Sequence, residues 1–479
     1  MKWKLRIVAI AVAGLFVTAS VGLGQQSRGI RNAGNATDDG NTNGSLISAS
    51  DESVSRISVG DEEPPPVPGT AIPPSPAAGN GMYGQGRGPS CGCNNPACCT
   101  PGCTNRSCDP CNCVSAGDCC SGGCGRRFNG WVTAEYLHVW AKGMGLPPLA
   151  TTDTPPGQGQ LGPGSTATVL FGGNVVGTNL TPSGRISAGL WLDESETDGV
   201  MVRFLGVGGN KHGFSGDTAG FPVLATPFFN TNPINPPPGI NDANVYSYPG
   251  RLAGSLNVNT VSNIYSTDAL FRWNVSRDVD YRIDLLGGYQ NSLLTSGVTV
   301  DGFATALAGP ATGTTFDIRD AFSARNSFNG GVIGLLGEAG RGPWTVSGLA
   351  KVGIGQFHQV VKINGSSTVN DGINPPQTFA GGVFAQPTNI GNFNRNKFGV
   401  IPELGLNLNR TLTRNLDFNF GYTFVYWSNV AMAGNQINTT VNGSQLLGGT
   451  LAGAAQPTHT FNTNNYYINA ISFGLTYHY

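Results

Sequence analysis

The chain has few charged residues and no excess of either sign. Asp, Glu, Lys and Arg make up 11% of its 479 residues, and 27 cationic side chains against 28 anionic ones give a formal net charge of -1. A surface that binds nucleic acid needs a clear excess of Lys and Arg. The composition therefore argues against nucleic acid as a partner.

Long apolar runs are also missing. The apolar run at residues 7–17 follows Lys2, Lys4 and Arg6 and precedes small residues, an order typical of a secretory signal peptide, to which we assign residues 1–24. No later stretch approaches the ~20 apolar residues that a spanning helix needs. If this exported chain enters a membrane, a closed barrel is the remaining way to satisfy its backbone groups.

Residues 25–90 contain few aromatic and branched apolar side chains. Such a segment buries too little apolar surface to offset the entropy of ordering, so we predict a disordered, Pro- and Gly-rich arm. Within it, residues 64–76 read PPPVPGTAIPPSP. This composition favours an extended polyproline spacer of about 40 Å, at ~3.1 Å per residue.

Cysteine is absent except within residues 91–128, which we predict to be a small module held by disulfides in place of an apolar core. Zinc is the alternative, because Cys108 and Cys111 form a CxxC pair, but the segment has no His and its other spacings are irregular. Full pairing of eleven cysteines leaves one thiol that is free or joins another chain. The cysteines are Cys91, Cys93, Cys98, Cys99, Cys103, Cys108, Cys111, Cys113, Cys119, Cys120 and Cys124.

The last fourteen residues, YYINAISFGLTYHY, alternate between two faces. One face carries Ile471 and the terminal signature Phe473, Leu475, Tyr477 and Tyr479, whereas the other is small or polar. Alternation indicates a strand, and an apolar row with aromatics toward its ends is typical of a strand that faces lipid. A half-buried strand of a soluble sandwich also alternates, but an aromatic terminus is typical of bacterial outer-membrane barrels.

Further alternating segments precede this strand. Residues 131–141 form the first, and four hairpins with short polar turns follow. Residues 129–479 are therefore predicted to be an all-β, antiparallel transmembrane β-barrel of about ten strands, with twelve as the alternative if a long connection contains a hairpin. The predicted hairpin strands are residues 183–192 and 199–207, 264–275 and 281–294, 328–339 and 344–363, and 398–409 and 416–428.

The connections between these strands alternate in length. Long connections are predicted at residues 142–182, 208–263, 295–327, 364–397 and 429–465. Outer-membrane barrels keep short turns in the periplasm and long loops outside. Both ends of the barrel are therefore expected on the periplasmic side, which predicts a periplasmic amino-terminal arm that anchors the chain through its cysteines to a cell-envelope polymer or to another chain.

Charged residues within the predicted strands lie on the face opposite the large apolar side chains. Because a charge that faces lipid is costly, we predict that these residues face the lumen. Their mixed signs favour ion pairs that close the lumen over strong ion selectivity. The predicted lumen-facing residues are Glu135, Arg185, Arg203, Asp268, Arg272, Arg282, Asp284, Glu338, Lys351, Glu403 and Asp417.

Four segments resemble one protein family. WVTAEYLHVWAKGMGLPPLATT from Trp131, VLFGG at residues 169–173, SGRISAGLWLD from Ser183 and GYTFVYWSNVAMAGNQINTTVN from Gly421 are similar to the putative beta-barrel porin family numbered seven, described from planctomycete-type bacteria. The resemblance covers about residues 130–479 and excludes the cysteine segment. It implies an outer-membrane barrel and suggests a porin, without supplying a substrate or functional residues.

The predicted strand number suggests a narrow or plugged pore. Eight strands leave a lumen filled by side chains and sixteen leave an aqueous channel, so ten or twelve lie between. We therefore predict a narrow porin for small polar solutes in the outer membrane, with lipid and the barrel-insertion machinery as partners. The alternatives are a non-conducting structural protein of the envelope and a loop-mediated binding or adhesion protein.

An enzyme is not predicted. A hydrolytic site needs a nucleophile, a base and an orienting group close together. His138 and His358 are predicted to face outward, His478 lies at the terminal edge, and His212 and His459 lie in loops without a Ser or Asp at a telling spacing. No cofactor or metal site is predicted either.

Overall fold

The computed structural model describes residues 129–234 and 239–479. The predicted signal peptide, arm and cysteine module lie outside the described residues. Within the described part, no helix is long and apolar enough to cross a membrane.

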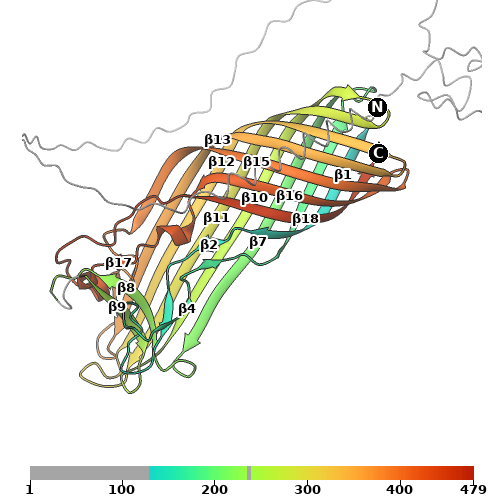
Figure 1. The fold of residues 1–479 in the computed structure, drawn as a ribbon. Coiled ribbons are helices and arrows are strands. Elements are labelled where there is room, and N and C mark those ends of the chain that lie inside the picture. Colours follow the sequence, from blue (N-terminus) through green and yellow to red (C-terminus); the bar gives the residue numbers. More distant parts are fainter. Residues whose placement is uncertain (1–128, 235–238) are drawn as a thin grey trace, which may run out of the picture. The chain divides into compact units, whose positions relative to one another are not determined.

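Ten antiparallel strands form a closed ring (Figure 1). The ring closes because β1 pairs with both β6 and β18, and β12 pairs with β13. This confirms the predicted all-β barrel of ten strands, and the twelve-stranded alternative is wrong. The ring strands are β1 (Gly130–Ala141), β6 (Thr181–Trp191), β7 (Asp198–Asp217), β10 (Leu252–Arg277), β11 (Tyr281–Ala306), β12 (Thr315–Arg341), β13 (Trp344–Asn370), β15 (Gly391–Thr413), β16 (Leu416–Val430) and β18 (Asn464–His478).

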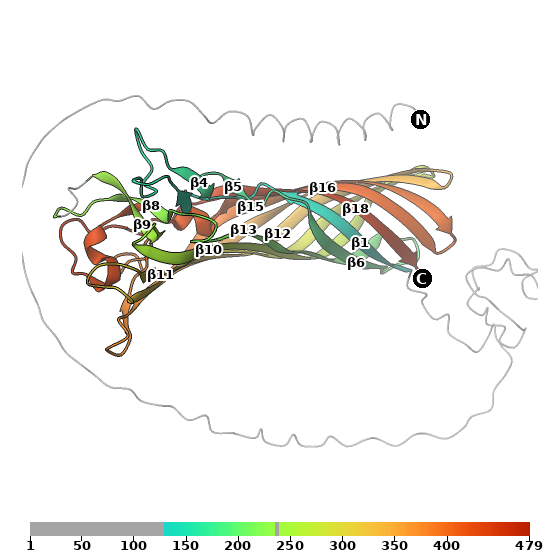
Figure 2. The ribbon, with the colours of Figure 1, turned by 90° about the horizontal axis from the view of Figure 1, so that it is seen from below.

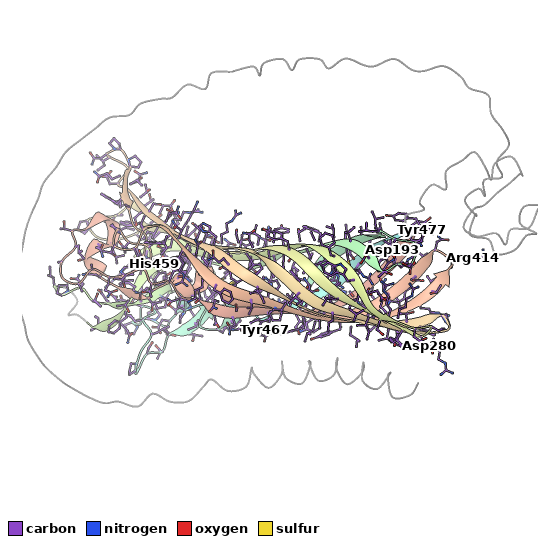
Figure 3. The ribbon with its side chains drawn as sticks, turned by 90° about the horizontal axis from the view of Figure 1, so that it is seen from above. Asp193, Asp280, Arg414, His459, Tyr467 and Tyr477 are labelled. Atoms are coloured by element: carbon purple, nitrogen blue, oxygen red, sulfur yellow. The ribbon has the colours of Figure 1, made fainter. Side chains whose placement is uncertain are left out.

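Four short turns lie at one end of the barrel, which we call the turn end. Figure 3 shows Asp193, Asp280 and Arg414 there and His459 at the opposite, loop end. The tight β12–β13 turn passes through Gly342, whose positive φ of 61° favours glycine. The barrel also begins and ends at the turn end, where Gly130 and Tyr479 exchange two backbone hydrogen bonds of 3.2 and 3.0 Å.

The wall is much taller on one side than on the other. Strands β10 to β13 are 26 or 27 residues long, whereas β1 and β6 have 12 and 11. The long connection predicted at residues 295–327 is wrong, because β11 continues to Ala306 and β12 begins at Thr315. Those residues still alternate, but the row that faces outward is mostly polar. A strand pattern defined by an apolar outer row therefore does not include them.

Near the turn end, the outer face of the wall is apolar. Phe418, Phe420 and Tyr477 point outward with 39, 43 and 54% of their surfaces exposed, as a lipid-facing band requires. Toward the loop end, rings pack along the wall in the pairs Trp140–Tyr422 and Phe424–Tyr467. Aromatic side chains thus border the apolar band at both of its edges.

Nearer the loop end, the polarity of the wall reverses. On β11, Val298 and Val300 face inward and are at most 1% exposed, while Thr299 and Asp301 lie on the outer face. The polar interior of the turn half therefore does not continue into this half. Here the interior is an apolar core and the outer face meets water.

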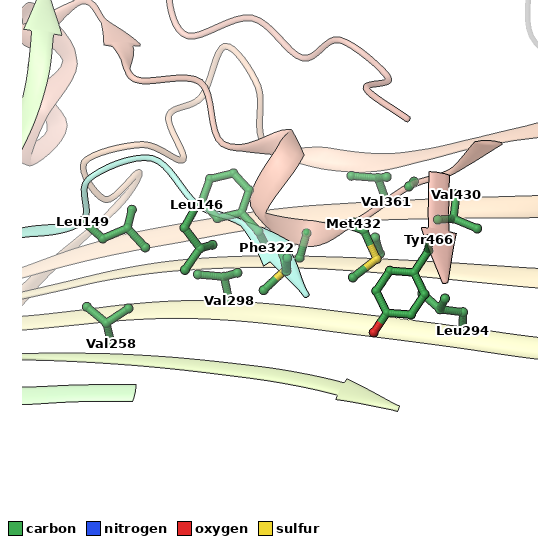
Figure 4. Packing of buried hydrophobic residues seen from close by; sticks show 14 of the residues in the cluster. Leu146, Leu149, Val258, Leu294, Val298, Phe322, Val361, Val430, Met432 and Tyr466 are labelled. Atoms are coloured by element: carbon green, nitrogen blue, oxygen red, sulfur yellow. The ribbon is translucent and has the colours of Figure 1, made fainter. Parts of the chain in front are cut away.

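Segments between the strands fill this core. Leu146, Leu149 and Met432 pack against wall residues such as Val298 and Phe322 (Figure 4). Figure 2 shows small strands gathered at the loop end, away from the carboxyl terminus. These smaller elements are β2 (Met144–Gly145), β3 (Ala150–Thr152), β4 (Thr168–Phe171), β5 (Val175–Val176), β8 (Leu224–Asn230), β9 (Ile240–Ser247), β14 (Gln377–Ala380), β17 (Thr440–Val441) and the 3-10 helices η2 (Ala433–Gln436) and η3 (Gly443–Gly448).

Candidate functional site

The interior of the turn half contains the eleven lumen-facing residues named from the sequence. They take part in ion pairs or line the cavities described below. Inward positions recur at every second residue, so Arg272 and Asp268 share the inner face of β10, and Arg282 and Asp284 share that of β11. The two-residue period of a strand thus determines that these side chains point into the lumen. Their position along each strand determines how far they lie from the turn end.

A cavity of about 780 Å³ occupies this half. Turn residues Asp278, Val279 and Asp280 line its mouth, and Glu135, Arg185 and Arg203 line it farther from the turns. We call this cavity the vestibule. Its lining mixes both charge signs with hydroxyl and amide groups, so it suits water and small polar solutes better than apolar ones.

Four charged residues meet across the lumen, and we call them the cross-lumen cluster. Arg203 Nη2 lies 2.6 Å from Glu403 Oε1, and Lys351 Nζ lies 2.5 Å from Asp268 Oδ2 and 2.9 Å from Glu403 Oε2. Arg203 Nη1 completes the cluster at 3.3 Å from Asp268 Oδ2.

The position of these strands shows that the cluster spans the barrel. Arg203 is on β7 and Glu403 is on β15, which lie five steps apart in either direction around the ring. Because side chains of opposite walls touch, the lumen is closed at this level. The four side chains are at most 11% exposed and their charges cancel.

Glu135 and Arg185 form a further ion pair beside the cluster. Arg185 Nη2 donates to Glu135 Oε1 at 2.7 Å, and its Nη1 donates to the Thr423 hydroxyl at 3.0 Å. Both charged side chains are at most 7% exposed. The guanidinium plane matches a carboxylate with two parallel bonds, which fixes both side chains.

A second charged group lies in the vestibule around Trp191. Arg282 and Arg272 lie over its ring, with their guanidinium carbons 4.0 and 4.6 Å from the ring centroid. Both arginines pair with the fully buried Asp284, and Arg272 also pairs with Glu338 at 3.1 Å. Each cation in this group is thus held by a carboxylate and an aromatic face.

Beyond the cross-lumen cluster, the interior becomes apolar. Trp427 on β16 is fully buried, and its Nε1 donates to Ser292 Oγ on β11 at 3.1 Å. Trp427 also borders a cavity of about 10 Å³ next to the cluster. Such a volume leaves space for about one water molecule, so this cavity does not continue the vestibule as a wide passage.

The segment after β16 folds into the barrel, and we call residues 431–437 the plug. Asn326 on β12 donates to the Ala431 carbonyl and accepts from its amide, both at 2.8 Å. Ser296 accepts from the Ala433 amide at 2.9 Å. The start of the plug is therefore anchored to the wall by hydrogen bonds as well as by packing.

A buried carboxylate anchors another inserted segment. Asp320 accepts hydrogen bonds from the amides of Val383, Phe384 and Ala385 at 3.0, 3.1 and 2.8 Å. Burial raises the pKa of Asp320 to about 6, although the three amides act in the opposite direction. This residue lies in the loop half, outside the lipid-facing band.

Sequence reasoning missed one pair at the mouth of the vestibule. His478 Nε2 lies 3.0 Å from Asp417 Oδ2, and these residues belong to adjacent strands β18 and β16. Pairing of the last strand with β16 would have brought them together, but that register is not readable from the sequence. Within the described residues, no group of three or more His, Cys, Asp and Glu side chains has the arrangement of a metal site.

A closed ring of antiparallel strands with an apolar outer band and an ion-paired interior defines a transmembrane β-barrel of the outer-membrane type. The chain belongs to the family described as putative beta barrel porin-7, whose sequence model matches residues 131–479. The resemblance noted from the sequence is thereby confirmed, as is the outer membrane as its location.

Solved structures to which the chain is similar include the following three proteins. The protease OmpT from Escherichia coli has 10% identity and a TM-score of 0.34, with 74% of this chain and 96% of that chain covered. A FadL homologue of Pseudomonas aeruginosa has 9% identity, a TM-score of 0.21 and coverages of 73% and 90%. The channel DcaP of Acinetobacter baumannii has 9% identity, a TM-score of 0.15 and coverages of 74% and 96%.

At these TM-scores, none of the three bears on the function of this chain. A search of the curated proteins found no match.

Proposed function

We propose that the protein is an outer-membrane channel for small polar solutes, and that its resting state is closed by the cross-lumen cluster. The observation that carries this proposal is the contact between Arg203 and Glu403 from opposite walls, at the inner end of a polar vestibule. A barrel that served only as a scaffold would not need a solvent-accessible vestibule. It would also not need that vestibule to end at ion pairs that have no net charge and that can separate.

The plug is the second barrier on the proposed path. It is held by hydrogen bonds at its first residues, and Ala431 and Ala433 are fully buried. Opening therefore requires the cluster to separate and the plug to withdraw from the core. Breaking bonds in a dry interior makes opening infrequent, which predicts low conductance in the resting protein.

Single-channel recording in planar bilayers tests the proposal. The full chain should open rarely, whereas the double variant Lys351→Met with Glu403→Gln should open about tenfold more often. This charge-neutral change removes one cation and one carboxylate, and with them three of the four ion-pair contacts of the closed state. Close pairs of this kind contribute on the order of 1.5 kcal/mol or more. Arg203 and Asp268 remain paired, which limits the damage to folding.

The matched control is Arg277→Met with Glu196→Gln. This pair lies at the vestibule mouth, with side chains 49% and 28% exposed, and the substitutions make the same change in charge. Its opening frequency should equal that of the wild type. Silence of the wild type and of the cluster variant, with correct insertion of both, would contradict the channel.

A non-conducting binding or structural protein is the second candidate. The observation in its favour is the apolar core of the loop half, where Leu149, Phe384 and Trp427 are fully buried as in a water-soluble domain. Silent bilayers would support this candidate. The channel is preferred over an enzyme because the family is described as a porin and because, among the described residues, nothing beyond the His478–Asp417 pair suggests catalysis.

We further propose that the amino-terminal arm lies in the periplasm and anchors the barrel through its cysteine module. The support is the sequence and the position of Gly130 at the turn end, where bacterial barrels have their periplasmic turns. Deletion of residues 26–125 should leave insertion intact and release the inserted barrel from the cell-envelope polymer or other chain that the arm holds. Unchanged retention, or monomers only in non-reducing electrophoresis, would count against anchoring or cross-linking respectively.

A further inference from the structure

A basic patch lies on the outer wall of β12 and β13, between the lipid-facing band and the loop end. Arg325, Lys362 and His358 are exposed there on the outer face of the two strands. Ser323, Ser327 and Asn396 surround them with hydroxyl and amide groups. We define these six residues as the basic patch.

The strand register brings the three cationic side chains together. Arg325 pairs with Val360, which lies between His358 and Lys362 on the same face of β13. Both of these residues are diagonal neighbours of Arg325, at Cα distances of about 7 to 8 Å. His358 is further fixed by a 2.9 Å hydrogen bond between its Nδ1 and Asn396 Oδ1.

No carboxylate of the described wall neutralises this patch. Arg325 donates only to the Ser327 hydroxyl, at 3.3 Å, and neither Arg325 nor Lys362 belongs to an ion pair among the described residues. On the outer face of β11, Asp301 lies six residues beyond the partner of Arg325, about 20 Å along the strand. Asp301 is in any case paired with Arg319 at 3.0 Å.

The patch is continuous with the lipid-facing band. Ile333 and Leu335 on β12 and Ile354 on β13 point outward with 47 to 55% of their surfaces exposed. The Tyr289 hydroxyl, 2.7 Å from Asn329 Oδ1, marks the edge of this band that is nearer the loop end. Arg325 lies four residues beyond Asn329, or about 10 Å along the axis of a tilted barrel, so a side chain of its length can extend back to the level of the lipid headgroups.

We propose that the basic patch binds the phosphate groups of an anionic lipid in the outer leaflet. Two permanent cations and a histidine complement a phosphate in charge, and the neighbouring hydroxyl and amide groups supply further hydrogen bonds. A phosphate held there places its acyl chains along Ile333 and Ile354, which a free anion cannot use. The inference rests on the outer-membrane placement and does not depend on conduction.

Titration of the purified, detergent-solubilised chain with diphosphoryl lipid A tests the proposal, with native mass spectrometry as the readout. Wild-type protein should bind lipid A in preference to phosphatidylcholine. Arg325→Gln with Lys362→Gln should weaken lipid A binding about thirtyfold, at ~1 kcal/mol per cation near an anionic surface. Phosphatidylcholine adducts should not change.

Arg341→Gln with Arg414→Gln is the matched control. It removes two exposed cations at the turn end and leaves the same net charge as the patch variant. An equal loss of lipid A binding in this control would overturn the proposal, because it would show that binding depends only on the net charge of the protein. Displacement of lipid A by millimolar inorganic phosphate would also overturn it, because the site would then bind a free anion. Failure of the patch variant to insert into vesicles would instead indicate misfolding, and Lys362→Gln alone, expected to lose about fivefold, then tests the patch.

Discussion

Lys351 connects two carboxylates that would otherwise repel each other. Its ammonium group contacts Asp268 and Glu403, and its side chain is only 1% exposed. In an interior that excludes water, a carboxylate without a partner cation is strongly unfavourable. Without Lys351, the single guanidinium of Arg203 would have to neutralise both carboxylates.

Lys351→Met should therefore lower the free energy of unfolding by about 3 to 5 kcal/mol, because it leaves an uncompensated buried charge. Urea unfolding of the barrel in lipid vesicles measures this. Arg277→Met is the comparison, and it should cost less than about 1 kcal/mol because the Arg277 side chain is 49% exposed and well screened. Similar losses in the two variants would contradict the burial argument.

The faces of the charged residues were readable from the sequence, whereas their partners were not. Spacing by two along a strand forces Asp268 and Arg272 onto one face, and lipid outside makes that face the inner one. Arg203 and Glu403, however, are 200 residues apart and meet through the space inside the barrel. Alternation of apolar and polar residues along a strand predicts which side of the sheet a side chain occupies. It does not predict the level along the barrel axis at which side chains of opposite walls meet.

Strand length illustrates the same limit for whole elements. Strand β12 begins at Thr315, whereas the sequence predicted its start at residue 328. The missed part has Asp317, Arg319 and Ser323 on its outer face, so it looks like a polar loop to any search for lipid-facing rows. The inner row of Ile318, Phe322 and Ala324 was the available signal, because apolar residues at every second position also indicate a strand.

The loop that carries His459 docks by stacking without polar partners for its imidazole. His459 lies against Phe393 at a centroid distance of 3.8 Å and edge-on to Phe461 at 5.2 Å. Neither ring nitrogen has a hydrogen-bond partner among the described residues. Burial, followed by the nearby Arg395, lowers the pKa of His459 below its ordinary value of 6.5.

Docking of this loop should weaken in acid. The docked imidazole prefers its neutral form. Its contribution to the stability of the docked loop is therefore complete above pH 6.5 and is lost as the pH falls through the lowered pKa. Hydrogen exchange at residues 456–463, corrected for intrinsic rates, should show less protection at about pH 5 than at about pH 7.5. His459→Phe keeps the stacking and should abolish the difference, and a persistent difference would assign it to another group.

At the scale of the whole molecule, the reversal of wall polarity divides the barrel into a lipid-facing half and a water-facing half. Leu335→Arg places a charge among lipid-facing residues and should lower the free energy of unfolding in vesicles by about 2 to 4 kcal/mol. Thr299→Arg, on the outer face of the other half, should change it by less than about 0.5 kcal/mol. Equal costs, measured by urea unfolding in vesicles, would contradict the assigned boundary.

The pairing of β1 with β18 also determines when the molecule can fold. Thr133 and Thr476, whose hydroxyls lie 2.9 Å apart in the seam, are separated by 343 residues. Bringing such distant segments together is entropically costly and slow, and it cannot begin before the end of the chain has been delivered. Until then, β1 and β16 present unpaired edges that invite aggregation.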